Sequence, residues 1–200
     1  MSIYTIVLFV HIIGAIGYFL SIGSWLFILV GLRRAQRVEE VRVLMHVNDL
    51  SGPFGDGSGL VLLSAGLYLA LSAWSLLTSW ILVALISLIL ILPTNAALIG
   101  PRRRALIKQL EGSAPEGEIS LALSQHIHNH VLWATSQTTA VLLLGIVFLM
   151  MTKPDLGSSL IVMAVALVFG LLSSLLISRR RYTSPQEAAD QRVPNNVSAS

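Results

Sequence analysis

The chain has 200 residues, of which 54% are hydrophobic and 12% are charged, and its formal net charge is +3. Soluble domains carry about 25% charged residues, so this composition excludes an ordinary soluble fold. The absence of cysteine excludes disulfides, thiolate metal sites and a cysteine nucleophile.

Four segments contain no Asp, Glu, Lys or Arg, namely 1–32, 57–101, 119–152 and 156–178. Each exceeds the roughly 18 apolar residues that can cross a bilayer. We therefore expect an all-α, polytopic membrane helix bundle.

The number of spans depends on the second uncharged segment. As one helix, residues 57–101 would be about 68 Å long, more than twice the roughly 30 Å hydrocarbon core. We place a turn at 75–79, between Trp74 and Trp80, because tryptophan favours the membrane interface. This predicts a transmembrane domain at 1–181. Its five spans are expected at about 3–32, 59–77, 80–100, 130–151 and 157–178. Residues 182–200 are polar and are expected to form a disordered cytoplasmic tail.

The basic residues predict the orientation of the spans. Twelve of the thirteen basic residues follow the first, third or fifth span, and only Lys153 lies on the other side. The twelve are Arg33, Arg34, Arg37, Arg42, Arg102, Arg103, Arg104, Lys108, Arg179, Arg180, Arg181 and Arg192. The positive-inside rule then predicts the N-terminus outside and the C-terminus inside, as in a multi-pass protein of the bacterial inner membrane. This basic balance points to a bilayer as partner and gives no reason to expect nucleic acid.

The segment between the first two spans has two parts. Apolar residues recur at helical spacing over 38–47, which predicts a short amphipathic helix lying on the inner surface or continuing into it. Residues 51–59 (SGPFGDGSG) contain four glycines and a proline but no Gly-Lys-Ser/Thr of a phosphate loop. We interpret them as a flexible hinge or re-entrant turn. With these boundaries no span has an acidic or basic residue in its middle, which argues against a carboxylate proton relay.

His11 is the one titratable group within a predicted span. It lies on or beside a stripe of mostly small residues at Gly14, Gly17 or Tyr18, Ser21 and Ser24, which lets helix backbones approach closely. His11 is therefore expected to point into the bundle. It is either an axial ligand of a haem or metal, or a partner of a quinone-like ligand, or a neutral imidazole bonded to a neighbouring helix.

A second group of histidines enters the fourth span from the inner side, at His126, His128 and His130. On one helix His126 and His130 would share a face at i, i+4, a spacing that can hold a metal, and His46 is the natural further ligand. The alternative is an interfacial cluster that contacts lipid headgroups and caps the helix. His11 is expected about 20 Å away along the membrane normal, so these are separate candidate sites.

Polar residues also cluster near the inner ends of the third and fourth spans. Asn95 follows Pro93 and Thr94, and residues 135–139 read TSQTT. Together with His130 they either line a pocket open to the cytoplasm or form interhelical hydrogen bonds, which contribute about 0.6 kcal/mol each.

The pattern VHIIGAIGYFLSIGSWLF at 10–27 resembles the first helix of a family of small bacterial integral membrane proteins of unknown function. That family is distantly similar to the copper-resistance D proteins and the bacterial membrane protoporphyrinogen oxidase. In those relatives the first-helix histidine is associated with haem or metal binding, and the resemblance implies this role for His11. The Trp and Lys/Arg companions expected beside a haem ligand are absent, and Tyr18 and Ser21 stand there instead.

Three hypotheses of function follow. The first is a non-enzymatic accessory or binding protein of the plasma membrane, with homo- or hetero-oligomers formed through small-residue helix faces. The second is a haem- or quinone-associated redox protein that uses His11. The third is a metal-handling or transport protein that uses His46, His126, His128 and His130. The sequence identifies no catalytic residue.

Overall fold

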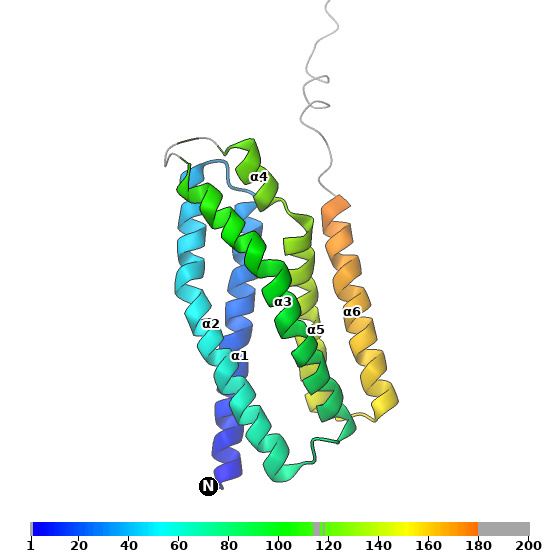
Figure 1. The fold of residues 1–200 in the computed structure, drawn as a ribbon. Coiled ribbons are helices and arrows are strands. Elements are labelled where there is room, and N and C mark those ends of the chain that lie inside the picture. The colour runs from blue at the N-terminus through cyan, green and yellow to red at the C-terminus, as the bar shows by residue number, and fades with distance from the viewer. Residues whose placement is uncertain (1, 114–116, 118, 180–200) are drawn as a thin grey trace, which may run out of the picture.

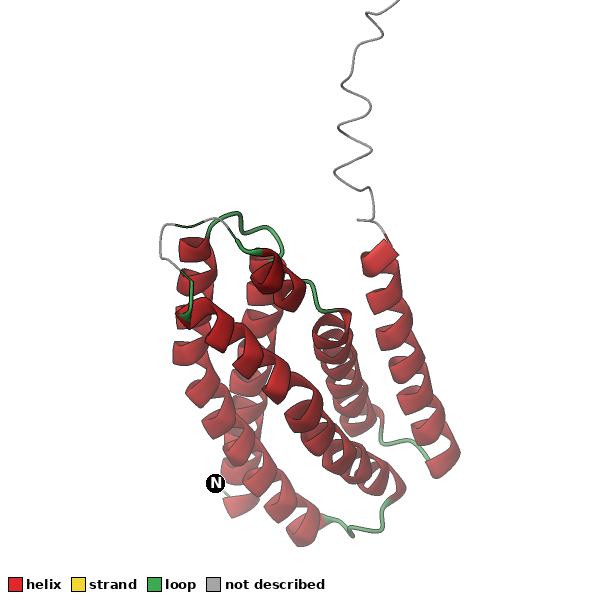
Figure 2. Cartoon of the chain, turned by 45° about the horizontal axis from the view of Figure 1, so that its top comes forward, coloured by secondary structure: helices red, strands yellow, loops and turns green. Residues whose placement is uncertain are grey.

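The computed structural model describes residues 2–113, 117 and 119–179, with the backbone alone at 175–179. This part of the chain is helical and contains no strand (Figure 2). Its helices are α1 (Ile3–Leu32), α2 (Val38–Ala73), α3 (Ser79–Glu111), α4 (Leu121–Ile127), α5 (His130–Thr152) and α6 (Leu156–Arg179). Five helical segments are long and apolar enough to cross a membrane, with α4 and α5 together forming one of them. The all-α, polytopic prediction is confirmed, and the predicted tail at 182–200 lies outside the described residues.

The helices form two antiparallel pairs joined by α3. The most extensive packing in the bundle is between α1 and α2, followed by α5 with α6. α3 runs obliquely between the pairs and packs mainly on α5 (Figure 1). We call one end of the bundle the tryptophan end, after Trp74 and Trp80, and the other the arginine end, after Arg33, Arg34 and Arg102–Arg104.

The turn predicted between the two tryptophans is confirmed. α2 ends at Ala73 and α3 begins at Ser79, and the rings of Trp74 and Trp80 meet edge to face at 5.6 Å. Lys153 ends α5 in the left-handed conformation, with φ at 48°. Its Nζ lies 4.6 Å from the centre of the Trp74 ring. The two short connections of the tryptophan end therefore touch each other.

The interpretation of 51–59 as a hinge or re-entrant turn is wrong. These residues are helical, Pro53 included, and α2 is continuous from Val38 to Ala73. The predicted amphipathic helix at 38–47 is the first part of that helix. Glycines are poor helix formers in isolation, but here Gly55 and Gly59 lie directly against Ser21 and Tyr18 of α1. Packing against a neighbouring helix thus outweighs the local propensity.

The arginine end holds a core that extends beyond the predicted spans, into residues 38–45, 106–110 and 123–127. α3 continues through Pro93 and Pro101 to Glu111, and α4 is an additional short helix whose N-cap Ser120 accepts from Leu123 N. The buried residues of this core come from α1 to α5: Ile28, Leu29, Leu32, Val38, Val41, Met45, Leu106, Leu110, Leu123, Ile127, Leu132 and Trp133. Leu106 and Leu110 share one helix face at i, i+4, so burying that face favours continued helix beyond Pro101.

Candidate functional site

His11 points from α1 onto the backbone of α2. Its Nδ1 lies 2.9 Å from the carbonyl oxygen of Leu62. Because a carbonyl only accepts, Nδ1 carries the proton and donates it, which leaves the lone pair of the neutral ring on Nε2. The ring packs over Gly66, where an added Cβ would be 2.8 Å from His11 Cε1. The imidazole is thus fixed in one tautomer and one orientation.

Glycines allow this close approach of α1 and α2. We call the contact the glycine seam, formed by Gly14, Gly17, Gly55, Gly59 and Gly66. A Cβ added at Gly14 would lie 2.8 Å from Leu62 N, and one at Gly59 would lie 3.2 Å from the Tyr18 ring. Cβ atoms at Gly17 and Gly55 would collide with Ser58 and Ser21. The predicted close packing along the small-residue stripe is confirmed, since backbone and serine side chains fill the space that side chains would take.

Two further polar contacts join α5 to its neighbours. Trp25 Nε1 donates to Ser136 Oγ at 3.0 Å, and Ser136 Oγ donates to its own helix. Thr139 Oγ1 donates to Asn95 Oδ1 at 2.8 Å. Of the two alternatives for this polar cluster, interhelical hydrogen bonding is therefore present between Asn95 and Thr139.

The histidines of the arginine end do not share one helix. α4 ends at Ile127 and α5 begins at His130, because Asn129 Oδ1 accepts from two backbone amides and caps α5. The helical i, i+4 arrangement of His126 and His130 is consequently not formed. Within the described ranges no three His, Cys, Asp or Glu side chains are grouped closely enough to hold a metal ion. The metal site that includes His46 and His128 stays a prediction.

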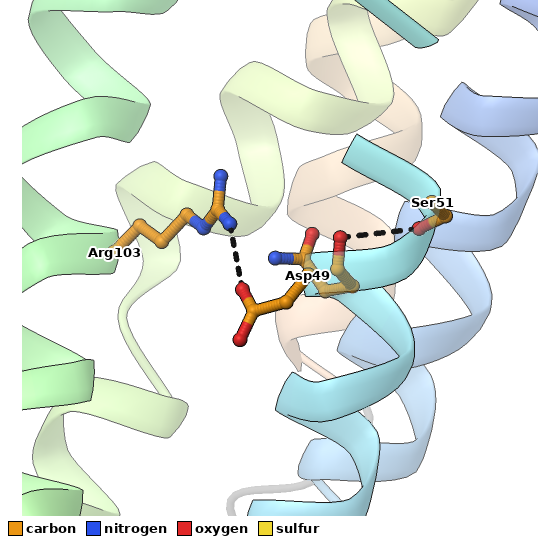
Figure 3. A network of polar contacts seen from close by, with 4 residues as sticks. Asp49, Ser51 and Arg103 are labelled. Atoms are coloured by element: carbon orange, nitrogen blue, oxygen red, sulfur yellow. Dashed lines mark hydrogen bonds and ion pairs between the residues drawn. The ribbon is translucent and has the colours of Figure 1, made fainter. Parts of the chain in front are cut away.

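A polar network at the arginine end of α2 and α3 was not predicted. The Arg103 guanidinium lies 3.2 Å from an Asp49 carboxylate oxygen, and Ser51 Oγ donates to the Asn48 carbonyl (Figure 3). Asn48 is buried beside this pair. When its side-chain amide is oriented so that both the oxygen and the nitrogen have suitable partners, the oxygen accepts a hydrogen bond from Arg103 Nε at 3.1 Å. No spacing rule connects residues 54 positions apart, so this contact had no signal in the sequence.

Asp56 is a second residue that sequence reasoning missed. It lies in α2 beside Gly55 and Gly59, which face Ser21 and Tyr18 of α1. Asp56 is therefore level with the middle of α1. Its side chain is exposed and lies within electrostatic range of the Tyr18 hydroxyl. The interpretation of 51–59 as a flexible hinge or re-entrant turn hid this position, although an acidic residue next to an apolar segment was visible.

The fold and these interhelical contacts define a polytopic α-helical integral membrane protein. Residues 5–154 match the family described as predicted integral membrane protein (DUF2269), and the chain belongs to this family. Comparison with curated proteins and with solved structures gave no match. The membership confirms the resemblance seen at residues 10–27 to small membrane proteins of unknown function. The likeness to copper-resistance D proteins stays a prediction.

Proposed function

We propose that this protein is a non-enzymatic accessory or binding protein of the bacterial inner membrane. The proposal rests on the hydrogen bonds that polar side chains of the transmembrane helices make to other helices. His11, Trp25 and Thr139 each bond to one partner on another helix, so each contact joins two helices. Such bonds, together with the glycine seam, build a scaffold that other membrane proteins can dock on.

The proposed orientation places the tryptophan end outside and the arginine end in the cytoplasm, in accord with the positive-inside rule. The chain contains no cysteine, so single-cysteine variants need no altered background. In intact cells a membrane-impermeant maleimide is expected to label a Ser75→Cys variant and to spare Ser113→Cys until the cells are opened. Labelling of Ser113→Cys alone in intact cells would reverse the orientation.

A second candidate is a haem- or quinol-binding protein, and the geometry of His11 favours it. Metal-ligating histidines commonly donate their other ring N–H to a backbone carbonyl, as Nδ1 of His11 does to Leu62. His11 would hold a haem iron through Nε2, and a quinol hydroxyl would donate to the same lone pair. A bound haem would supply one-electron transfer. The contribution of the chain is to fix the imidazole by the Leu62 carbonyl and Gly66.

One measurement separates the accessory role from haem binding. The reduced-minus-oxidised visible spectrum of the detergent-purified protein is recorded for wild type, His11→Ala and the matched control His128→Ala. The accessory role predicts no Soret or α band in any of the three proteins. A band present in wild type and His128→Ala but lost in His11→Ala, with helix content unchanged by circular dichroism, would replace the accessory role with the redox role.

A further inference from the structure

A groove lies between the end of α1 and the start of α2, at the arginine end of the bundle. Its volume is about 470 Å³, and most of its lining is apolar. Gly31 of α1 keeps the groove open, because an added Cβ there would lie 3.0 Å from Leu44 Cδ1 of α2. Val43 lines the groove and is 59% exposed, whereas Val41 and Met45 are buried in the core. The groove is therefore on the face of α2 that points away from the bundle.

Charges of both signs line this groove. Arg34 follows α1, Glu39 and Glu40 are in the first turn of α2, and all three side chains are exposed. Glu40 Oε2 accepts a hydrogen bond from the backbone amide of Gln36 at 2.9 Å, which holds this carboxylate in place. Among the described residues neither glutamate forms an ion pair with Arg34. The groove thus presents a cation and two carboxylates that do not neutralise each other by direct contact.

The groove lies at the level of the lipid headgroups. Trp25 of α1 bonds to Ser136 of α5, so these two residues are at the same depth. The two helices run in opposite directions (Figure 1), with Gly31 six residues after Trp25 and His130 six residues before Ser136. Gly31 is therefore level with His130, where α5 begins. From there α5 extends for 23 residues, about 34 Å, which is close to the roughly 30 Å hydrocarbon core.

The depth measured along α2 agrees with this level. Leu44 is 30 residues before Trp74, which is about 45 Å along the helix. Tryptophan favours the membrane interface, and a bilayer with both of its headgroup layers is about 40–45 Å thick. The groove beside Leu44 consequently lies in the headgroup layer opposite to that of Trp74.

We propose that this groove binds the headgroup of phosphatidylethanolamine, a zwitterionic phospholipid. The lipid phosphate accepts hydrogen bonds from the Arg34 guanidinium, and the primary ammonium donates to Glu39 and Glu40. The glycerol and the first methylene groups lie against Val43 and Leu44, which removes apolar surface from water. This lipid site goes beyond the proposed accessory function and does not depend on it.

Charge complementarity selects this occupant over two other phospholipids. Phosphatidylglycerol offers a phosphate to Arg34 but no cation to Glu39 and Glu40, and the two carboxylates repel its negative charge. Phosphatidylcholine carries both charges, but its trimethylated ammonium has no N–H with which to donate a hydrogen bond to a carboxylate. Comparison of the three lipids therefore tests the ammonium contact and the phosphate contact separately.

The test titrates these three lipids, with identical acyl chains, into the delipidated full chain in detergent, and native mass spectrometry counts the bound lipids. Wild-type protein is expected to bind the first molecule of phosphatidylethanolamine at least about fivefold more tightly than either other lipid, the effect of one exposed ion pair. Equal affinities for the three lipids would overturn the proposal without any variant. So would equally tight binding of glycerophosphoethanolamine, which has no acyl chains, because the occupant would then be a soluble molecule.

Variants of the chain locate the two contacts. The double variant Glu39→Gln, Glu40→Gln is expected to lose the preference for phosphatidylethanolamine. Because glutamine keeps an acceptor oxygen, the hydrogen bond that holds residue 40 is retained. Arg34→Gln is expected to weaken the binding of all three lipids. The matched controls Arg42→Gln and Glu111→Gln remove exposed charges of the same end that do not line the groove, and they are expected to keep the wild-type affinities. A preference that survives in the double variant, or that is lost equally in the controls, would contradict the site.

Discussion

The arginine end and the glycine seam are packed by different means. Most of the fully buried large side chains lie at the arginine end, among them Leu32, Val38, Val41, Leu106, Leu123 and Leu132. Along the seam the contacts are made by glycines against serines, backbone atoms and the rings of His11 and Tyr18. The first region resembles the core of a soluble protein, whereas in the second the large side chains pack on glycines.

The difference follows from the solvent at each depth. At the arginine end the chain is charged and in contact with water and headgroups, so burial of Leu and Val is driven by the hydrophobic effect. Within the bilayer, lipid tails are as apolar as leucine, and association depends on close packing and interhelical hydrogen bonds. Variants of the two regions are therefore expected to lose stability for different reasons.

The largest effect is expected from Leu123→Ala in α4. Leu123 is 0% exposed, and truncating a buried leucine costs about 2–5 kcal/mol, since apolar burial is lost and a cavity remains. The free energy of unfolding is measured by denaturant titration in mixed micelles. Leu121→Ala is the control in the same helix, because Leu121 is 79% exposed. Equal losses in both variants would show that the arginine end is not a hydrophobic core.

A smaller loss is expected from Gly14→Ala in the glycine seam. The new Cβ would lie 2.8 Å from the backbone nitrogen of Leu62, so α1 and α2 must move apart, and overpacking costs about 1–3 kcal/mol. Gly23→Ala in the same helix is the control, because an added Cβ there meets nothing within 4 Å. It should be neutral or stabilise by up to about 1 kcal/mol through helix propensity. The same unfolding titration measures both, and a neutral Gly14→Ala would refute the close approach.

Replacing each of two adjacent threonines by valine is expected to change the free energy of unfolding differently. Thr139→Val removes the hydrogen bond to Asn95 and should cost about 0.6 kcal/mol. Thr138→Val removes a buried hydroxyl for which no hydrogen-bond partner is found among the described residues, so stability should stay equal or rise. Unfolding titrations of the single and double variants test this. A loss in Thr138→Val as large as that in Thr139→Val would contradict these assignments.

The smallest effect expected is a pH dependence of stability that comes from Asp155 at the tryptophan end. Hydrogen bonds from the Ser158 side chain and backbone hold the pKa of the Asp155 carboxyl below its ordinary value of 3.8. A lowered folded-state pKa means that the carboxylate stabilises the fold above pH 3.8 and that this contribution disappears as pH falls through the folded value. Melting temperatures between pH 2 and 6 should show wild type converging on Asp155→Ala at the acid end. A constant difference across the range would contradict this linkage.

The helices that cross the membrane could be predicted because their signal is compositional. The uncharged segments and the tryptophan pair gave five spans and the turn before Ser79, and both are confirmed. The continuity of α2 could not be predicted from local sequence. Four glycines and Pro53 indicate a break, and only the fit of Gly55 and Gly59 against Ser21 and Tyr18 of α1 explains why the helix continues.

The candidate sites were predicted less completely than the fold. The direction of His11 follows from the small-residue stripe beside it, and the bond to Leu62 is one of the alternatives expected. For His126 and His130 the helical spacing was misleading, since Asn129 between them is a good N-cap residue and starts a new helix. Asp49 and Arg103 meet only through the crossing of α2 and α3, which no local pattern contains.

The pairing of neighbouring helices has a consequence for biosynthesis. α1 with α2, and α5 with α6, are hairpins whose partners follow each other in the chain and whose packing dominates the bundle. Such local contacts close short loops and form quickly. We expect the first hairpin to assemble in the membrane while the ribosome is still translating α3, and the second hairpin to assemble after it. α3 would then be the last helix to be enclosed, when both hairpins are present to receive it.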